Sequence, residues 1–202
     1  MKLYFTPGAC SMAPHILLRE SGQKFDLEQV DLASKKTKSG ADYKKVNGKG
    51  YVPALQLDNG EVITEAPIIL QYIADQKPES GLVPKAGTME RYRTQEWLNF
   101  VTSELHKGLG ALFNPAVPDA YRTIAIDRIG TRLDFLESKL QGKQYLQGDK
   151  FTAPDAYLFT ILSWAPHLKV SLDKWPGIQA YLGRVAARPQ VQATLKAEGL
   201  TK

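Results

Sequence analysis

Short apolar segments separated by turn-forming residues run through the first 77 positions, and this pattern predicts a small α/β unit. Four segments are typical of strands: residues 2–5, 25–32, 51–57 and 61–64. Two others have helical spacing, residues 12–20 and 65–73, and a short helix is expected near residues 41–46. Asn59-Gly60 predicts a hairpin between the last two strands. The order of elements predicts a four-stranded mixed sheet with helices on its faces.

The rest of the chain carries only helical periodicity, so the second domain is expected to be all-α. Residues 78–88 combine proline, glycine and serine, which is typical of a linker. Helices are expected at residues 89–112, 120–140, 153–167, 178–188 and 190–198. We therefore divide the chain into an α/β domain (residues 1–77), the linker, and a helical domain (residues 89–202).

One helix start has its own signature. Thr152 is a favoured N-cap residue, and Asp155 three positions later makes the pair a near relative of the capping box. We interpret this motif as structural, with a contribution of roughly 0.5–2 kcal/mol, and not as catalytic.

Composition and charge narrow the class of protein. The 202 residues are 43% hydrophobic and 23% charged, as in ordinary globular proteins. No apolar stretch is long enough for a membrane span, and the first residues lack the apolar core of a signal peptide. The net charge of +5 is modest, and its lysines are not interleaved with aromatic residues, so nucleic acid is not an expected partner. The lone cysteine cannot form an internal disulfide, which agrees with a reducing cytosol.

That cysteine, Cys10, lies in the turn between the first strand and the first helix. A thiol at a helix N-terminus tends toward thiolate, because the free N–H groups and the helix dipole favour negative charge. The alternative is a small buried residue without chemistry. No second cysteine follows two or three residues later, which excludes dithiol exchange. Ser11 beside it is a candidate helix cap or a hydrogen-bond donor to a bound thiolate.

Two further candidates stand at strand ends. Glu65 precedes a helix, where a carboxylate is favourable for the helix itself. Alternatively, Glu65 accepts from a ligand ammonium while the Ala66 N–H binds a carboxylate, as an amino-acid ligand would require. A cis peptide bond between Val52 and Pro53 would leave the Val52 backbone available to an extended ligand.

Polar residues also form a stripe on the long helix. Asn99, Ser103 and His106 are spaced by four and three positions, so they share one helical face. The stripe is either solvent-exposed surface or the wall of a cleft. The three histidines form no cluster in the sequence, so no metal site is expected. Phosphate-binding glycine loops and the Gly-x-Ser-x-Gly elbow are absent from the sequence.

Together, several motifs resemble those of the glutathione transferases. They are Cys10-Ser11 at the first helix, Tyr-Val-Pro-Ala-Leu at residues 51–55, the Thr64-Glu65 turn, and Phe-Thr-Ala-Pro-Asp-Ala-Tyr at residues 151–157. Residues 1–11, 96–107 and 188–200 are similar to the bacterial beta class in particular. The resemblance covers essentially the whole chain.

The resemblance implies a thioredoxin-like N-terminal domain, an all-helical C-terminal domain and a cytosolic homodimer. Glutathione, the cosubstrate, would lie in the first domain, and a hydrophobic electrophile in the cleft. The resemblance places Cys10 beside the glutathione sulfur, Lys35 near the glycyl end, Val52 with Pro53 at the cysteinyl part, and Glu65 with Ala66 at the γ-glutamyl end.

On the helical side, the resemblance implies that the site is lined by Asn99, Ser103, Glu104, Leu105 and His106. Glu104 is rotated roughly 100° from Ser103 by helix geometry, so we expect it to face the partner subunit. The electrophile pocket would draw on Leu109, Leu112, Phe113, residues 115–118 and Trp164. One departure is Ala66, where the superfamily usually has serine; the lost neutral hydrogen bond is worth about 0.5–1.5 kcal/mol.

The function implied is conjugation of the glutathione thiol to electrophilic small molecules, as in detoxification. The thiolate would be stabilised by the helix N-terminus, by Cys10 and Ser11, and by His106. Glutathione-dependent thiol–disulfide exchange through Cys10 is a second activity, similar to that of a monothiol glutaredoxin. A non-catalytic ligand-binding or regulatory protein of the same fold is the remaining alternative.

Overall fold

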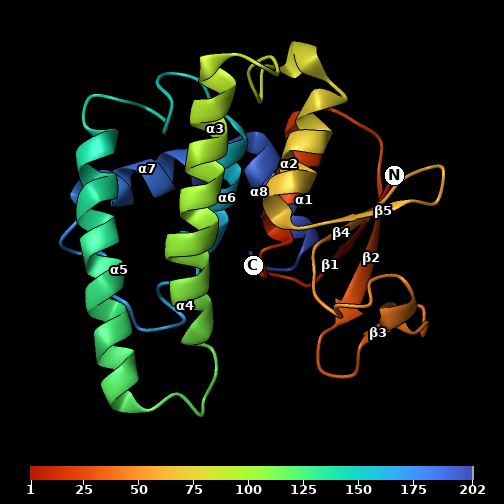
Figure 1. Ribbon diagram of the computed structural model, residues 1–202, viewed down its shortest axis with the longest axis horizontal. Helices are drawn as coiled ribbons and strands as arrows, with labels where there is room; N and C mark the ends of the chain where they lie inside the picture. The colour runs from red at the N-terminus through yellow and green to blue at the C-terminus, as the bar shows by residue number, and fades with distance from the viewer. Residues whose placement is uncertain (202) are drawn as a thin grey trace. The chain divides into compact units, whose positions relative to one another are not determined.

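The computed structural model describes residues 1–201. Its chain forms two compact units, and Figure 1 shows the elements of each. The first unit holds Met1–Val83 together with the C-terminal segment from Arg188, and the second holds Pro84–Ala187. The sequence division placed everything after residue 88 in the helical domain. The last helix instead packs with the first unit, because it contacts that unit's first helix directly.

The sheet of the first unit has strand order β3-β2-β1-β4-β5. The central strand β1 (Lys2–Phe5) runs parallel to β2 (Asp26–Asp31) and antiparallel to β4 (Ala54–Gln56), and β5 (Val62–Thr64) closes one edge. The thioredoxin-like mixed sheet is therefore confirmed. It has five strands and not four, because β3 (Lys36–Thr37) pairs antiparallel with the end of β2. Two polar edge residues carry no periodic signal, so this strand is invisible in the sequence.

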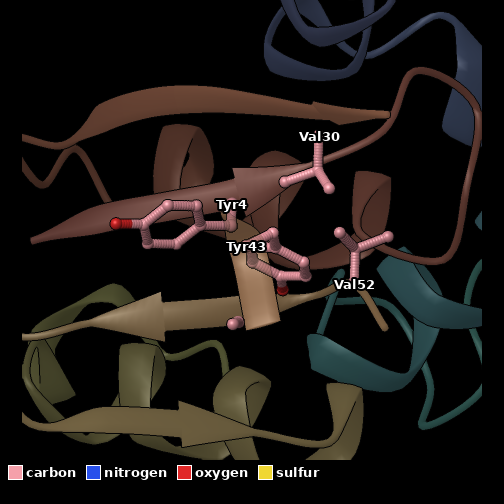
Figure 2. Close-up of a cluster of buried hydrophobic side chains, with 5 residues drawn as sticks. Tyr4, Val30, Tyr43 and Val52 are labelled. Carbon is pink, nitrogen blue, oxygen red and sulfur yellow. The ribbon is translucent and has the colours of Figure 1, made fainter. Parts of the chain in front are cut away.

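Helices cover one face of this sheet, and a small aromatic core fills the other. Helix α1 (Met12–Glu20) contacts both α2 (Ala66–Asp75) and α8 (Pro189–Ala197). Because strand side chains alternate, Tyr4 points away from these helices. It forms a buried cluster with Val30, Tyr43, Val52 and Ala54. Figure 2 labels all of these except Ala54. The Tyr4 and Tyr43 ring centroids are 5.5 Å apart. This cluster holds the Val52 segment against the sheet.

Two single-turn 3₁₀ helices complete the first unit, Tyr43–Lys45 and Pro78–Ser80. The Tyr43 hydroxyl donates to the Tyr51 carbonyl at 2.7 Å. Burial raises the pKa of Tyr43 to about 12, against the lowering effect of its hydrogen bond with Asn47.

The second unit is helical throughout its named elements. They are α3 (Met89–Phe100), a π-helical turn η3 (Val101–His106), α4 (Lys107–Ala111), α5 (Asp119–Leu140), α6 (Ala153–Leu162) and α7 (Pro176–Ala186). Helix α6 is central, since all ten of its residues are buried and it contacts α3, η3 and α7. The predicted helix at residues 89–112 is continuous, but the π turn changes its register from Val101 onward.

The capping motif at the start of α6 forms as predicted. Both halves of the box are present, with the Asp155 carboxylate accepting from the Thr152 amide at 2.9 Å. Asp155 also accepts from the Leu146 amide at 2.9 Å and from the Tyr181 hydroxyl at 3.0 Å. The helix ends at Leu162, earlier than the predicted residue 167, because Pro166 disfavours helical geometry just before it.

Among the described residues, none of the helices has the length and apolarity needed to cross a membrane.

Candidate active site

The loop that carries Cys10 is closed by short-range hydrogen bonds. The Ala9 amide donates to the Thr6 carbonyl at 3.0 Å, and the Met12 amide to the Ala9 carbonyl at 2.9 Å. Gly8 adopts a left-handed φ of +71° that the turn requires. Cys10 is half-buried, two residues before α1. Its Sγ donates to the Val52 carbonyl at 3.2 Å, so the cysteine and the Val52 backbone adjoin.

Ser11 does not cap the helix. It is fully buried, and no side-chain capping bond forms at α1. Its Oγ accepts from the Thr6 amide at 3.1 Å and donates to the Thr6 carbonyl at 3.2 Å. The capping prediction is therefore wrong, because the loop folds back tightly enough for Thr6 to take both bonds. Since its one hydroxyl proton is already donated, Ser11 shapes the Cys10 loop.

A buried polar network supports the same loop from the other end of the chain. The Gly8 amide donates to Glu198 Oε2 at 2.8 Å, and Glu198 Oε1 lies 2.8 Å from His15 Nδ1. Arg19 Nε donates to His15 Nε2 at 3.1 Å, so that nitrogen is an acceptor and the ring proton lies on Nδ1. Both His15 and Glu198 have fully buried side chains. Sequence reasoning missed this network, because its members are separated by up to 190 positions.

The Val52–Pro53 peptide bond is cis, as the sequence hypothesis required. The Val52 carbonyl accepts from Cys10, whereas its amide makes no hydrogen bond with any residue in the described part of the chain. Lys35 stands nearby in a left-handed conformation, with φ of 57°. Its Nζ donates to the Gly50 carbonyl at 3.0 Å and lies 5.8 Å from the centre of the Tyr51 ring. Lys35 and Cys10 thus both contact the backbone of residues 50–52 in the first unit.

Glu65 and Ala66 form the start of α2. Glu65 has φ of 70° and its carbonyl accepts from the amides of Ile68 and Ile69 at 3.0 Å each. The Ala66 amide heads the helix and has no hydrogen-bond partner among residues 1–201. Glu65 Oε1 pairs with Lys49 Nζ at 2.6 Å, and the two side chains are 60% and 52% exposed. Lys49 was missed by sequence reasoning, because no spacing rule links it to Glu65.

On the helical unit, the polar stripe coincides with the π turn. Asn99 and Ser103 are exposed, and Ser103 Oγ donates to the Asn99 carbonyl at 3.0 Å. Glu104 Oε2 pairs with Arg132 Nε of α5 at 2.5 Å, and the Leu105 side chain is fully buried. Leu105 can therefore offer only backbone to a ligand. A groove of about 220 Å³ lies beside them, bordered by Ser103, Glu104, Lys107, Arg128 and Arg132.

His106 ends the π turn and lies against aromatic side chains. Its Nδ1 is 2.6 Å from the Tyr157 hydroxyl of α6. The His106 ring meets Trp164 nearly edge-on, with centroids 5.1 Å apart, and Trp164 meets Phe113 in the same way at 5.3 Å. Phe113 is half-exposed, whereas Leu109 and Leu112 are buried. The sequence marks Tyr157 only as part of the motif at the start of α6. Its contact with His106 could not be predicted, because the two residues are 51 positions apart.

The candidate residues therefore form two groups, each within one unit. Cys10, Ser11, Lys35, Val52, Pro53, Glu65 and Ala66 lie in the first unit, and the five residues at positions 99, 103, 104, 105 and 106 lie in the second. No cluster of three metal-ligating side chains occurs in the part of the chain that the structure describes.

Comparison with known proteins gives the family. Models of the glutathione S-transferase N-terminal and C-terminal domains match residues 8–76 and 100–189. The chain is 46% identical to glutathione S-transferase GstA of Escherichia coli O157:H7, over 99% of this chain and 100% of that protein. It superposes with a TM-score of 0.96 on a beta class glutathione S-transferase from Sphingomonas chungbukensis, at 48% identity with both chains fully covered. For a sphingomonad glutathione S-transferase solved with glutathione, the TM-score is 0.95 and the identity 46%, again over both full chains.

The chain belongs to the glutathione S-transferase family. It is an enzyme of that family, and its activity is the conjugation of glutathione to electrophilic small molecules.

Proposed function

We propose that this chain is a beta class glutathione transferase in which Cys10 stands beside the glutathione sulfur. The observation that carries the proposal is the 3.2 Å contact between Cys10 Sγ and the Val52 carbonyl. It brings the lone thiol, a helix N-terminus and a strand-like backbone segment to one place. An extended tripeptide thiol needs all three, namely backbone pairing for its amide groups and positive potential for its sulfur.

The ends of glutathione find complementary groups on the same unit. The unpartnered Ala66 amide, at the positive end of α2, binds the γ-glutamyl carboxylate, and Glu65 accepts from the adjacent ammonium. Lys35 binds the glycyl carboxylate by moving its Nζ from the Gly50 carbonyl. Because Glu65 is paired with Lys49, the ligand ammonium must compete with an exposed ion pair, which costs about 0–1 kcal/mol.

In conjugation, glutathione loses its thiol proton to solvent water, and its thiolate attacks an electrophilic carbon as the leaving group departs with its electron pair. Binding lowers the pKa of the glutathione thiol through the dipole of α1 and through donors near the sulfur. We assign those donors to Cys10, whose S–H turns from the Val52 carbonyl to the glutathione sulfur, and to His106. Asn99 and Ser103 complete the glutathione site on the helical side, with Glu104 turned toward a partner subunit in a homodimer.

A second activity is favoured by the position of Cys10, which is half-buried and not sealed in the core. The Cys10 thiolate attacks a glutathione mixed disulfide, takes the glutathionyl group and releases the other thiol. A second glutathione then attacks the sulfur of the glutathionyl group on Cys10, so that glutathione disulfide leaves and the Cys10 thiolate is restored. The electrons come from glutathione, which is the cosubstrate.

For the electrophile we propose a hydrophobic small molecule that packs against Phe113 and Trp164, an apolar wall with Phe113 half-exposed. A cytosolic location follows from the dependence of both reactions on reduced glutathione.

The test compares Cys10→Ala with Cys10→Ser, which keeps a hydroxyl donor but has no thiol chemistry. We expect both variants to lose disulfide reduction. Conjugation of a chlorodinitrobenzene should survive better in Cys10→Ser than in Cys10→Ala, because only the former can donate to the sulfur. Equal disulfide reduction by wild type and Cys10→Ala would refute the exchange activity. Failure of the wild type to bind glutathione in a calorimetric titration would refute the proposed glutathione site.

A further inference from the structure

Tyr157 takes no part in the reaction steps proposed above, but its hydroxyl contacts His106. Its side chain is 1% exposed, and it lies on α6, in which all ten residues are buried. Its hydroxyl is 2.6 Å from His106 Nδ1, and the two rings meet edge-on at 5.7 Å with an interplanar angle of 89°. A buried hydroxyl at this distance makes a strong and directional hydrogen bond.

Such a bond decides which ring nitrogen of His106 carries the proton. A neutral imidazole has one donor nitrogen and one acceptor nitrogen, and the partner of one nitrogen sets the role of the other. A phenol hydroxyl is a better donor than an imidazole N–H, and an imidazole nitrogen is a better acceptor than a phenol oxygen. The Tyr157 hydroxyl therefore donates to Nδ1, and the ring proton lies on Nε2.

The surroundings also fix the plane of the His106 ring. Trp164 packs against it, with ring centroids 5.1 Å apart and planes at 68°. On its Nε2 side the next helical turn offers Gly110, where a side-chain carbon would lie 3.8 Å from His106 Cδ2. The glycine leaves space beside that edge of the ring, whereas Tyr157 occupies the Nδ1 edge.

We propose that Tyr157 is a positioning residue that holds His106 in the Nε2–H tautomer, so that His106 presents a hydrogen-bond donor from Nε2. The tautomer follows from contacts within the helical unit alone. The consequence for catalysis rests on the proposed function: the Nε2–H donor stabilises the glutathione thiolate, and Tyr157 keeps the ring proton on Nε2.

The chain carries an internal reference for the measurement. His15 accepts from Arg19 at Nε2 and pairs with Glu198 at Nδ1, so its proton lies on Nδ1. His15 and His106 are thus expected in opposite tautomers. In the nitrogen NMR spectrum of ¹⁵N-histidine-labelled protein without glutathione, His106 should show a protonated Nε2 and His15 a protonated Nδ1. The His106→Asn variant assigns the His106 signals.

Tyr157→Phe removes only the hydroxyl, and Tyr145→Phe is the matched control, since Tyr145 is another buried tyrosine of the same unit. We expect Tyr157→Phe to mix the His106 tautomers and to lower kcat about 2- to 10-fold, the effect of one hydrogen bond. The KM for glutathione should change less, because the bond acts on the thiolate. Tyr145→Phe should change neither.

A protonated Nδ1 on His106 in the wild type would overturn the proposal, even if Tyr157→Phe does not fold. An unchanged tautomer together with unchanged kcat in a folded Tyr157→Phe variant would also overturn it. Failure of glutathione binding would leave the tautomer result standing and would instead count against the proposed function.

Discussion

Asp155 joins three segments of the helical unit, and its replacement tests whether this junction holds the unit together. Its two carboxylate oxygens accept four hydrogen bonds. Oδ1 accepts from the Leu146 amide and the Tyr181 hydroxyl, and Oδ2 from the amide and hydroxyl of Thr152. The Asp155 side chain is fully buried, so water cannot replace it.

The cost of Asp155→Ala can be worked from these donors. The two hydroxyls have other acceptors within reach, because Thr152 Oγ1 lies 3.3 Å from Gln147 Oε1 and the Tyr181 hydroxyl 3.3 Å from the Asp155 carbonyl. The Leu146 and Thr152 amides have none. Each buried donor left unpaired costs about 1–3 kcal/mol, so the free energy of unfolding should fall by about 2–6 kcal/mol. Asp155→Asn keeps one acceptor oxygen and should cost about half as much.

Thr152→Ala is the control, since it removes only the N-cap hydroxyl and should cost about 0.5–2 kcal/mol. Urea denaturation monitored by tryptophan fluorescence gives the midpoint and slope for each variant. The expected order of destabilisation is Asp155→Ala, then Asp155→Asn, then Thr152→Ala. If Asp155→Ala proved no less stable than Thr152→Ala, the carboxylate would be an ordinary helix cap and would not hold the three segments together.

Three further outcomes are expected. Glu198→Ala leaves the Gly8 amide and the buried His15 ring without their acceptor, so unfolding free energy should fall by about 2–6 kcal/mol and the Gly8 amide should exchange faster with solvent; unchanged exchange would contradict this. In an alkaline absorbance titration, Tyr43 should ionise only near pH 12. The stability that its raised pKa contributes should be lost as the pH rises through that value. Tyr43→Phe should remove this ionisation from the titration curve. The Ser39 amide lowers the pKa of Glu28, so in an NMR titration this carboxyl should have a lower midpoint than an ordinary glutamate. Its contribution to the free energy of unfolding should be lost as the pH falls through that lowered pKa. A normal midpoint would argue against the 3.0 Å hydrogen bond.

Local sequence patterns predicted much of the fold. The strand at residues 2–5, the first helix and the Thr152–Asp155 box depend on neighbours within a few positions, so propensity and spacing predict them. Strand β3 escaped prediction, because a two-residue polar edge is specified by its partner strand and not by its own pattern. The π turn also escaped prediction; it contacts α6, a helix from a distant part of the sequence.

The candidate site divides in the same way. Cys10, Val52 and Ala66 became candidates because a turn, a proline and a helix start mark them locally. The partners that fix their geometry come from distant positions, as the Glu198 carboxylate on the Gly8 amide shows. Ser11 was misjudged for the same reason: its sequence position suits a cap, but the fold of the loop gives its hydroxyl to Thr6.

The return of α8 to the first unit has a consequence for biosynthesis. A ribosome adds about 5–20 residues per second, and N-terminal domains generally fold first during synthesis. The Gly8 amide, however, meets its acceptor at Glu198, 190 residues later. The strands of the first unit can assemble early, but the loop that presents Cys10 stays incomplete until Glu198 has been added. The Cys10 loop is therefore completed only after the helical unit, Pro84–Ala187, has been synthesised.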